Sequence, residues 1–293
     1  MVTRKCDKEN CKEKNGNCLI TGSDSLPVQC VGPWVEDKYY YLERYLNASR
    51  EARRKYSDLN NAVFLDLFAG PGRCIIKDEC REIENGAIRV LKRKEAPFNV
   101  SYLLDIDEEN LKALTARVPP KASSYETING DSNLLVKGLV DKLLKHRFKR
   151  YHFVFADPFG PDSLKFETIK ELARLQRVDI LIHFPIMAIR RNWHTWIKKD
   201  NTILDEFLGT EKWREEIASL PKNKVFDSLI NLYEYELKKI GFAFTYDLKP
   251  VTIRNTMNAP LYDLILVSKD PLAQKIWNTT INKTPDGQKT FGF

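Results

Sequence analysis

The chain has 293 residues, of which 43% are hydrophobic and 30% charged. This composition can bury a full core, so intrinsic disorder is excluded as the default state, and the length allows one large domain or two. A formal net charge of +7 gives only a mild attraction to polyanions, far below that of a histone-like binder. The longest apolar run, 178–189, is too short to span a bilayer, and no signal-like apolar segment opens the sequence. We therefore expect a cytoplasmic protein with no membrane association.

Cysteine is concentrated near the start of the chain. Cys6, Cys11, Cys18 and Cys30 are spaced C-x4-C-x6-C-x11-C among Lys, Asn and Gly, with no accompanying His. Four thiolates can close a tetrahedral zinc site or hold an iron–sulfur cluster, and a short polar segment with little core needs such a cross-link. Paired C-x2-C knuckles are missing, so free thiols in a loose arm are the alternative. Residues 1–32 are predicted to be a cysteine-rich arm with a metal site as one of two interpretations.

Strand and helix patterns alternate after this arm. An amphipathic helix is predicted over 32–56, with apolar residues recurring at three and four. The predicted strands that follow are 62–67, 100–107, 124–131, 150–156 and 178–184. The helices between them are predicted at 84–94, 108–118, 134–148 and 163–176. Such alternation requires right-handed crossovers and a parallel sheet that is covered on both faces.

The pattern changes after residue 185. Residues 186–240 read as wholly helical, and strands are then predicted at 242–248 and 261–268, separated by 249–260. A strand pair that closes a parallel sheet after a helical insertion fits a seven-stranded arrangement whose last strand is antiparallel. We therefore predict an α/β fold with a doubly wound, Rossmann-like seven-stranded sheet. Its domain covers residues 33–293, with the insertion at about 186–240.

A glycine loop follows the first predicted strand of the sheet. Asp66-x-x-x-Gly70-x-Gly72 lies at the carboxyl end of that strand, where open α/β sheets bind ligands. The dinucleotide fingerprint G-x-G-x-x-G is incomplete, because position 75 is Ile. A carboxylate at Asp66 can pair with a cationic amino group, whereas a phosphate would be repelled. The loop therefore favours S-adenosylmethionine (SAM) over NAD as the cofactor.

Further acids end the next strands in turn. Asp105 is placed to accept from both ribose hydroxyls, and Asp131 from the adenine amino group. Phe68 and Ile106, which lie beside these acids in the sequence, complete the predicted cofactor-binding residues. Acids at strand ends are also common helix caps, an alternative that accounts for Asp107 and that also applies to Asp131.

Two segments are rich in basic residues. Residues 137–150 hold six Lys or Arg against one Asp, which is typical of a solvated helix face. Residues 189–199 interleave four Lys or Arg with Trp193 and Trp196. These tryptophans could stack on bases while the cations hold phosphates, or they could pack in the core.

Several segments resemble a known group of enzymes. "FLDLFAGPGR", "LLDIDEEN", "GDSN" and "FADPFG" resemble class I SAM-dependent methyltransferases, with Asp157-Pro158-Phe159-Gly160 in the slot of their catalytic D/N-P-P-aromatic turn. More closely, "CVGPWVEDKYYYLERYL" and "LYDLILVSKDPLAQKIW" are similar to the three-Cys-motif partner (TcmP) family, over roughly Val31 to Trp277. That family is named for a companion protein with a radical-SAM-like cysteine triplet.

The resemblance implies a SAM-dependent methyltransferase that acts on an exocyclic amine of a nucleic-acid base in DNA or RNA. Asp157 and the Pro158 carbonyl would accept hydrogen bonds from the amine of an extruded base, and Phe159 would either stack on that base or pack inward. Gly160 stands where the amino-methyltransferases usually have an aromatic residue. The alternative implied function is a non-catalytic or SAM-binding partner of a radical-SAM-like companion enzyme.

Overall fold

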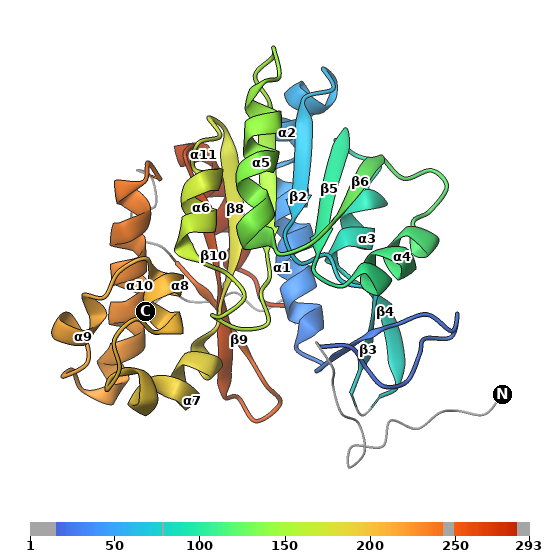
Figure 1. Ribbon diagram of the computed structural model, residues 1–293. Helices are drawn as coiled ribbons and strands as arrows, with labels where there is room; N and C mark the ends of the chain where they lie inside the picture. Colours follow the sequence, from blue (N-terminus) through green and yellow to red (C-terminus); the bar gives the residue numbers. More distant parts are fainter. Residues whose placement is uncertain (1–15, 78, 243–248, 286–293) are drawn as a thin grey trace.

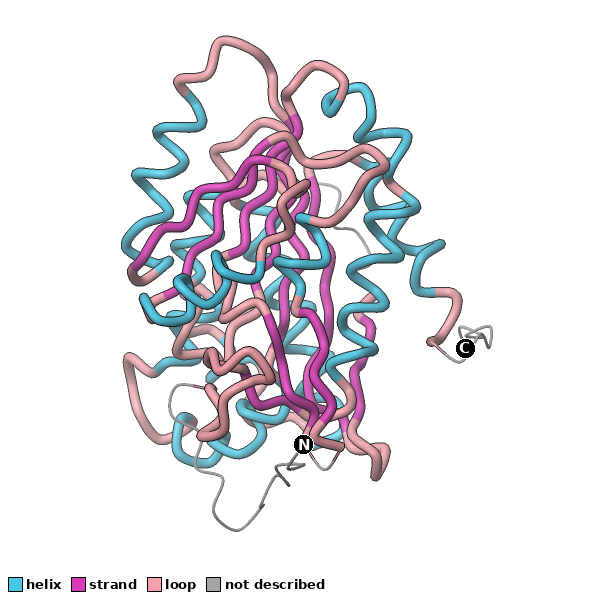
Figure 2. Tube along the Cα trace, turned by 90° about the vertical axis from the view of Figure 1, so that its right-hand side faces the viewer, coloured by secondary structure: helices cyan, strands magenta, loops and turns pink. Residues whose placement is uncertain are grey.

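The protein folds around a seven-stranded sheet with helices on both faces (Figures 1 and 2). The structure, a computed structural model, describes residues 16–77, 79–242 and 249–285. Within these residues the strand order is β6-β5-β2-β7-β8-β10-β9. The strands are β2 (Ala62–Asp66), β5 (Val100–Asp105), β6 (Ser124–Asn129), β7 (Tyr151–Ala156), β8 (Val178–Phe184), β9 (Val251–Arg254) and β10 (Pro260–Ser268).

The direction of the strands fixes where the site can form. Neighbouring strands from β6 to β8 are parallel, whereas β10 is antiparallel to both β8 and β9. The predicted Rossmann-like sheet with an antiparallel last strand is confirmed. Because β2, β5 and β7 are parallel and adjacent, their carboxyl ends share one edge of the sheet. That edge brings together Asp66, Asp105 and Asp157.

Hydrophobic cores fill both sides of the sheet. All five residues of β2 are buried, because a parallel strand covered on both faces has no solvated side. One face is covered by α1 (Val35–Ala48), α3 (Gly86–Leu91), α4 (Glu108–Arg117) and α11 (Pro271–Ile281). The other face is covered by α5 (Ser132–Leu144), α6 (Phe166–Leu172) and the helices that follow β8.

The amphipathic helix predicted over 32–56 is divided into two helices. α1 ends at Ala48 and α2 (Arg50–Ser57) begins after Ser49. The predicted apolar face is confirmed, since Val35, Tyr39, Leu42 and Leu46 are all buried. The same face also buries Lys38, whose ammonium the periodic pattern does not account for.

The segment after β8 is helical as predicted. It contains α7 (Ile186–Trp196), α8 (Ile203–Leu208), α9 (Trp213–Glu216) and α10 (Lys222–Lys239). Trp193 packs on Trp213 with 5.2 Å between ring centroids, and Trp196 is buried. Trp196 therefore belongs to the core of the insertion, whereas Trp193 is half-buried against that core, and base stacking by Trp193 stays a prediction.

A second, smaller sheet was not predicted. β1 (Gln29–Val31) pairs in parallel with β3 (Arg73–Ile76), which forms a hairpin with β4 (Arg81–Glu84). The hairpin directly follows the glycine loop, where the sequence pattern suggested no strand. Because β1 belongs to the cysteine-rich segment, pairing with β3 joins that segment to the main domain.

The sequence also misplaced some element boundaries. α6 begins at Phe166, with Lys165 at its N-cap position, and so starts later than the predicted residue 163. The strand predicted over 242–248 lies almost wholly outside the described residues, and β9 occupies part of the expected connection 249–260. No helix in the described part of the chain is long and apolar enough to cross a membrane.

Candidate functional site

The glycine loop leaves β2 in a backbone conformation that glycine permits. Gly70 and Gly72 have φ values of +61° and +86°, in the left-handed region that side chains rarely adopt. A Cβ on Gly72 would also lie 3.1 Å from Leu114 Cδ1 of α4, closer than ordinary packing allows. The loop is therefore tightly held against α4, with its backbone N–H groups near the edge of the sheet.

Asp105 fastens this loop to the neighbouring strand. Its carboxylate accepts hydrogen bonds from Gly70 N at 2.8 Å, Asp107 N at 2.8 Å and Asn110 Nδ2 at 3.1 Å. Burial raises the pKa of Asp105, while these hydrogen bonds oppose the rise. Asp105 thus orders the loop, and a carboxylate with two oxygens keeps acceptor sites for a ligand.

Asp66 is a buried acid with few partners of its own. Only 2% of its surface is exposed, and its Oδ1 accepts from Phe68 N at 3.1 Å. Burial raises the pKa of Asp66 to about 8, and the nearby charges of Asp157 and Asp105 add to the rise. A cationic ligand group placed beside Asp66 would lower that pKa, so this carboxyl is suited to receive one.

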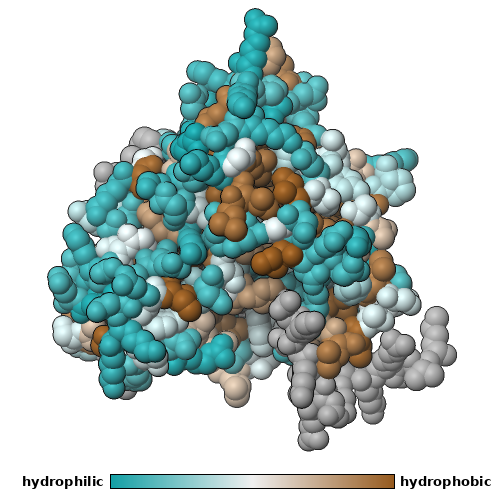
Figure 3. Space-filling view, viewed as in Figure 1, coloured by the Kyte–Doolittle hydropathy of each residue, from teal (hydrophilic) through white to brown (hydrophobic). Residues whose placement is uncertain are grey.

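The remaining predicted cofactor residues lie at the same edge in different settings. Asp131 is the N-cap of α5 and accepts from Asn133 N at 2.8 Å, so the helix-cap interpretation accounts for its position. Phe68 is half-buried, whereas Ile106 is 69% exposed directly after β5. Figure 3 shows hydrophobic residues gathered near the middle of the face presented in Figure 1.

Asp157, at the end of β7, is already bound by two side chains. Its Oδ2 pairs with Lys38 Nζ from α1, and its Oδ1 lies 2.9 Å from His183 Nδ1 at the end of β8. Burial alone would raise the pKa of Asp157, but Lys38 and His183 outweigh burial and hold it at about 2. Asp157 is therefore a fixed, ionised acceptor at neutral pH and a weak base.

His183 is held in one tautomer by this contact. Burial lowers its pKa, so the ring is neutral at pH 7. An ionised carboxylate can only accept a hydrogen bond, so Nδ1 carries the ring proton and donates a hydrogen bond to Asp157. The ring of Tyr262 from β10 packs against it, with 3.9 Å between centroids. Sequence analysis missed Lys38, His183 and Tyr262; a histidine at the end of a buried strand was the available signal.

The rest of the Asp-Pro-Phe-Gly turn divides between core and surface. Pro158 is buried, whereas Phe159 is 60% exposed and points out of the domain core. A Cβ on Gly16 would lie 2.0 Å from Phe159 Cζ, so the ring lies against the backbone of the N-terminal segment. The inward-packing interpretation of Phe159 is therefore wrong, and its ring forms part of the surface beside the site.

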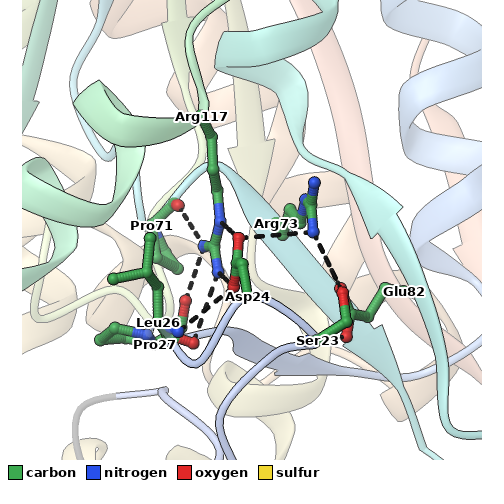
Figure 4. Close-up of polar contacts among 8 residues, drawn as sticks. All are labelled: Ser23, Asp24, Leu26, Pro27, Pro71, Arg73, Glu82 and Arg117. Atoms are coloured by element: carbon green, nitrogen blue, oxygen red, sulfur yellow. Dashed lines mark hydrogen bonds and ion pairs between the residues drawn. The ribbon is translucent and has the colours of Figure 1, made fainter.

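The segment 16–31 is tied to the glycine loop by a network of polar contacts (Figure 4). The Arg117 guanidinium, on a side chain only 3% exposed, binds both carboxylate oxygens of Asp24 at 2.7 and 2.8 Å. It also donates to the carbonyl oxygens of Pro27 and Pro71, each at 2.6 Å. The hydrogen bond from Arg117 is the main cause that lowers the pKa of Asp24 to about 2. The described part of this arm is thus built into the domain.

Only two of the four predicted metal ligands lie within the described residues. Cys6 and Cys11 lie outside them. Cys18 and Cys30 each follow one of the two residues of the isolated bridge between Asn17 and Gln29. Among the described residues, no group of three or more His, Cys, Asp or Glu side chains could hold a metal ion. The zinc or iron–sulfur site stays a prediction.

Comparisons with known proteins find remote structural likeness only. No protein-family model and no curated protein matches the sequence. The structure of Trm1 from Pyrococcus horikoshii with S-adenosyl-L-methionine matches with 16% identity and a TM-score of 0.37, over 93% of this chain and 64% of that one. Protein LPL1258 from Legionella pneumophila matches with 11% identity and a TM-score of 0.46, over 88% of this chain and 95% of that one.

A putative SAM-dependent methyltransferase from Listeria monocytogenes matches with 12% identity and a TM-score of 0.38, over 76% of this chain and 99% of that one. This chain spans less than two thirds of Trm1. Membership of the TcmP family stays a prediction.

Proposed function

We propose that the protein is a SAM-dependent methyltransferase that acts on an exocyclic amine of a nucleic-acid base. The observation that supports this most is that two features occur together at one sheet edge. Asp66 is buried with a raised pKa, and Asp105 holds the constrained glycine loop beside it. A group with a cationic amine and ribose hydroxyls matches these acids, whereas a pyrophosphate does not. Bound SAM would supply an electrophilic methyl group on a sulfonium.

Asp157 would act on the substrate side of the site. As an ionised carboxylate it can accept a hydrogen bond from the amine N–H while Lys38 and His183 keep it in place. The buried Pro158 offers the next carbonyl as a second acceptor, and the exposed Phe159 ring offers a surface for stacking a base. These contacts would hold the amine lone pair for in-line attack, so positioning supplies the acceleration and little acid–base chemistry is needed.

Cofactor binding is the first thing to test. Calorimetry should show SAM binding to the wild type, and Asp66→Ala and Gly70→Val should each remove it. Asp162→Ala, in an exposed residue beyond the Asp-Pro-Phe-Gly turn, is the control and should bind SAM as the wild type does. Failure to bind SAM, or equal binding by Asp66→Ala, would reject the cofactor assignment.

Methyl transfer is the second test. Labelled methyl from SAM should enter one of three pools, total tRNA, rRNA or genomic DNA, and Asp157→Ala should abolish incorporation. Alanine removes both carboxylate oxygens, so no side-chain acceptor is left for the amine. Equal incorporation by the wild type and Asp157→Ala would remove Asp157 from the reaction.

A second candidate function is a SAM-binding or non-catalytic partner of a radical-SAM-like enzyme. It is favoured by the two partners that already occupy Asp157 and by Gly160, which presents no aromatic ring. SAM binding without transfer to any nucleic-acid pool would support this alternative. On either assignment we propose that Cys6, Cys11, Cys18 and Cys30 hold one zinc ion or one iron–sulfur cluster.

A further inference from the structure

The hydroxyl of Tyr262 is buried without a partner at the edge of the candidate site. The residue is 6% exposed, and its hydroxyl makes no hydrogen bond within the described part of the chain. Most buried polar groups are hydrogen-bonded, and one left unpaired destabilises the folded state. An unpaired hydroxyl in a candidate site is therefore a group that a ligand can satisfy.

The position of Tyr262 is on the substrate side of the sheet edge. Asp263 pairs with Phe184 across β10 and β8, which places Tyr262 just beyond the carboxyl end of β8. Its ring packs on His183, and His183 in turn contacts Asp157. The negative charge of Asp157, after burial, contributes to a raised pKa of Tyr262. The hydroxyl therefore keeps its proton at neutral pH and can act as a hydrogen-bond donor.

The Asp157 carboxylate and the Tyr262 hydroxyl form a complementary pair of a hydrogen-bond acceptor and a hydrogen-bond donor. Asp157, ionised and fixed by Lys38 and His183, can only accept a hydrogen bond. Tyr262 can donate one. An amino-substituted base carries the matching pair, because the carbon that bears the exocyclic amine is bonded to a ring nitrogen with a lone pair. The amine on a lysine side chain or a simple alkylamine has no such neighbouring acceptor.

We propose that Tyr262 is a substrate-specificity residue that donates its hydroxyl hydrogen to the ring nitrogen beside the amine, while Asp157 accepts from the amine itself. This inference rests on the proposed methyltransferase function and assigns the substrate class to amidine-like edges of nucleobases. His183 is a positioning residue in this arrangement: it orients Asp157 through Nδ1 and supports the Tyr262 ring. Removal of the hydroxyl should cost about tenfold in kcat/KM, the usual loss for one neutral hydrogen bond.

Another buried tyrosine provides a matched control. Tyr233 of α10 is fully buried in the insertion core against Phe166, Phe184 and Phe207, and its hydroxyl also has no partner among the described residues. Tyr262→Phe and Tyr233→Phe each remove one unpaired buried hydroxyl. Both variants should therefore melt at or above the wild-type temperature, because neither loses a hydrogen bond of the free protein.

The experiment combines thermal melting of the three proteins with calorimetry of SAM and labelled-methyl transfer to total tRNA, rRNA and DNA. We expect Tyr262→Phe to keep SAM affinity and to lose about tenfold in transfer, while Tyr233→Phe transfers like the wild type. Equal transfer by Tyr262→Phe and the wild type would overturn the specificity role and leave the proposed function intact. A lower melting temperature of Tyr262→Phe relative to Tyr233→Phe would also overturn it, by showing that the hydroxyl stabilises the free protein. No transfer by the wild type would instead reject the proposed function, and the inference with it.

Discussion

Replacing Asp66 with asparagine should make the protein more stable, relative to the wild type, as the pH rises. In the folded protein, burial raises the pKa of Asp66 from 3.8 to about 8, with Asp157 and Asp105 adding to the rise and Lys38 opposing it. Between these two values the folded state keeps a proton that the unfolded state has lost. The free energy of unfolding of the wild type therefore falls with increasing pH over this window.

The size of this pH effect on the free energy of unfolding follows from the one proton that folded Asp66 keeps. One bound proton of difference changes the free energy of unfolding by about 1.4 kcal/mol per pH unit, so the contribution of Asp66 falls by about 3 kcal/mol between pH 5 and pH 7. The asparagine side chain of the variant does not titrate, and its oxygen can still accept from Phe68 N. The stability of Asp66→Asn relative to the wild type should therefore rise by about 3 kcal/mol over that interval.

Urea unfolding followed by circular dichroism at pH 5, 6 and 7 and constant ionic strength measures this difference. Asp24→Asn is the matched control. The pKa of Asp24 is lowered to about 2, so its contribution to stability is complete above the unfolded value of 3.8 and is the same at pH 5 and pH 7. A difference between Asp66→Asn and the wild type that stays constant from pH 5 to pH 7 would refute the raised pKa. On the proposed function, the stabilised Asp66→Asn variant should also fail to bind SAM.

Three further outcomes are expected. Lys38→Met should destabilise the protein by about 3 kcal/mol at pH 7 in urea unfolding, because it leaves Asp157 buried and without its cation. That loss should shrink as the pH falls toward 2, where the folded-state carboxylate of Asp157 becomes protonated; a pH-independent loss would contradict the ion pair. Arg117→Ala should speed proteolysis within residues 16–31 relative to Lys170→Ala, an exposed control on α6, and equal cleavage rates would show that the polar network does not hold the arm. Elemental analysis should find about one zinc per chain, or iron in cluster stoichiometry, lost in Cys18→Ser; metal-free protein with all four thiols titratable would reject this site, formed by Cys6, Cys11, Cys18 and Cys30.

The order of elements along the sheet could be predicted because it depends on local patterns. Continuous apolar strands such as β2 and β8, separated by amphipathic helices, specify a parallel sheet covered on both faces. The small sheet of β1, β3 and β4 could not be predicted in the same way. Its strands are only three or four residues long, β4 has no fully buried residue, and β1 pairs with a strand more than forty residues away. Such pairing depends on contacts between distant segments, which the local pattern of apolar residues does not indicate.

The sequence by itself determined the acids at the strand ends, because side chains that terminate parallel strands must meet at one edge. It thereby located Asp66, Asp105 and Asp157 together. Only the tertiary structure decided how those acids behave, since a pKa depends on burial and on charges brought from distant segments. Lys38 arrives from α1 and His183 from β8 to fix Asp157 as an acceptor, while Asp66 has no such cation in direct contact among the described residues. Two aspartates with the same intrinsic chemistry are thus driven to opposite pKa shifts by the fold.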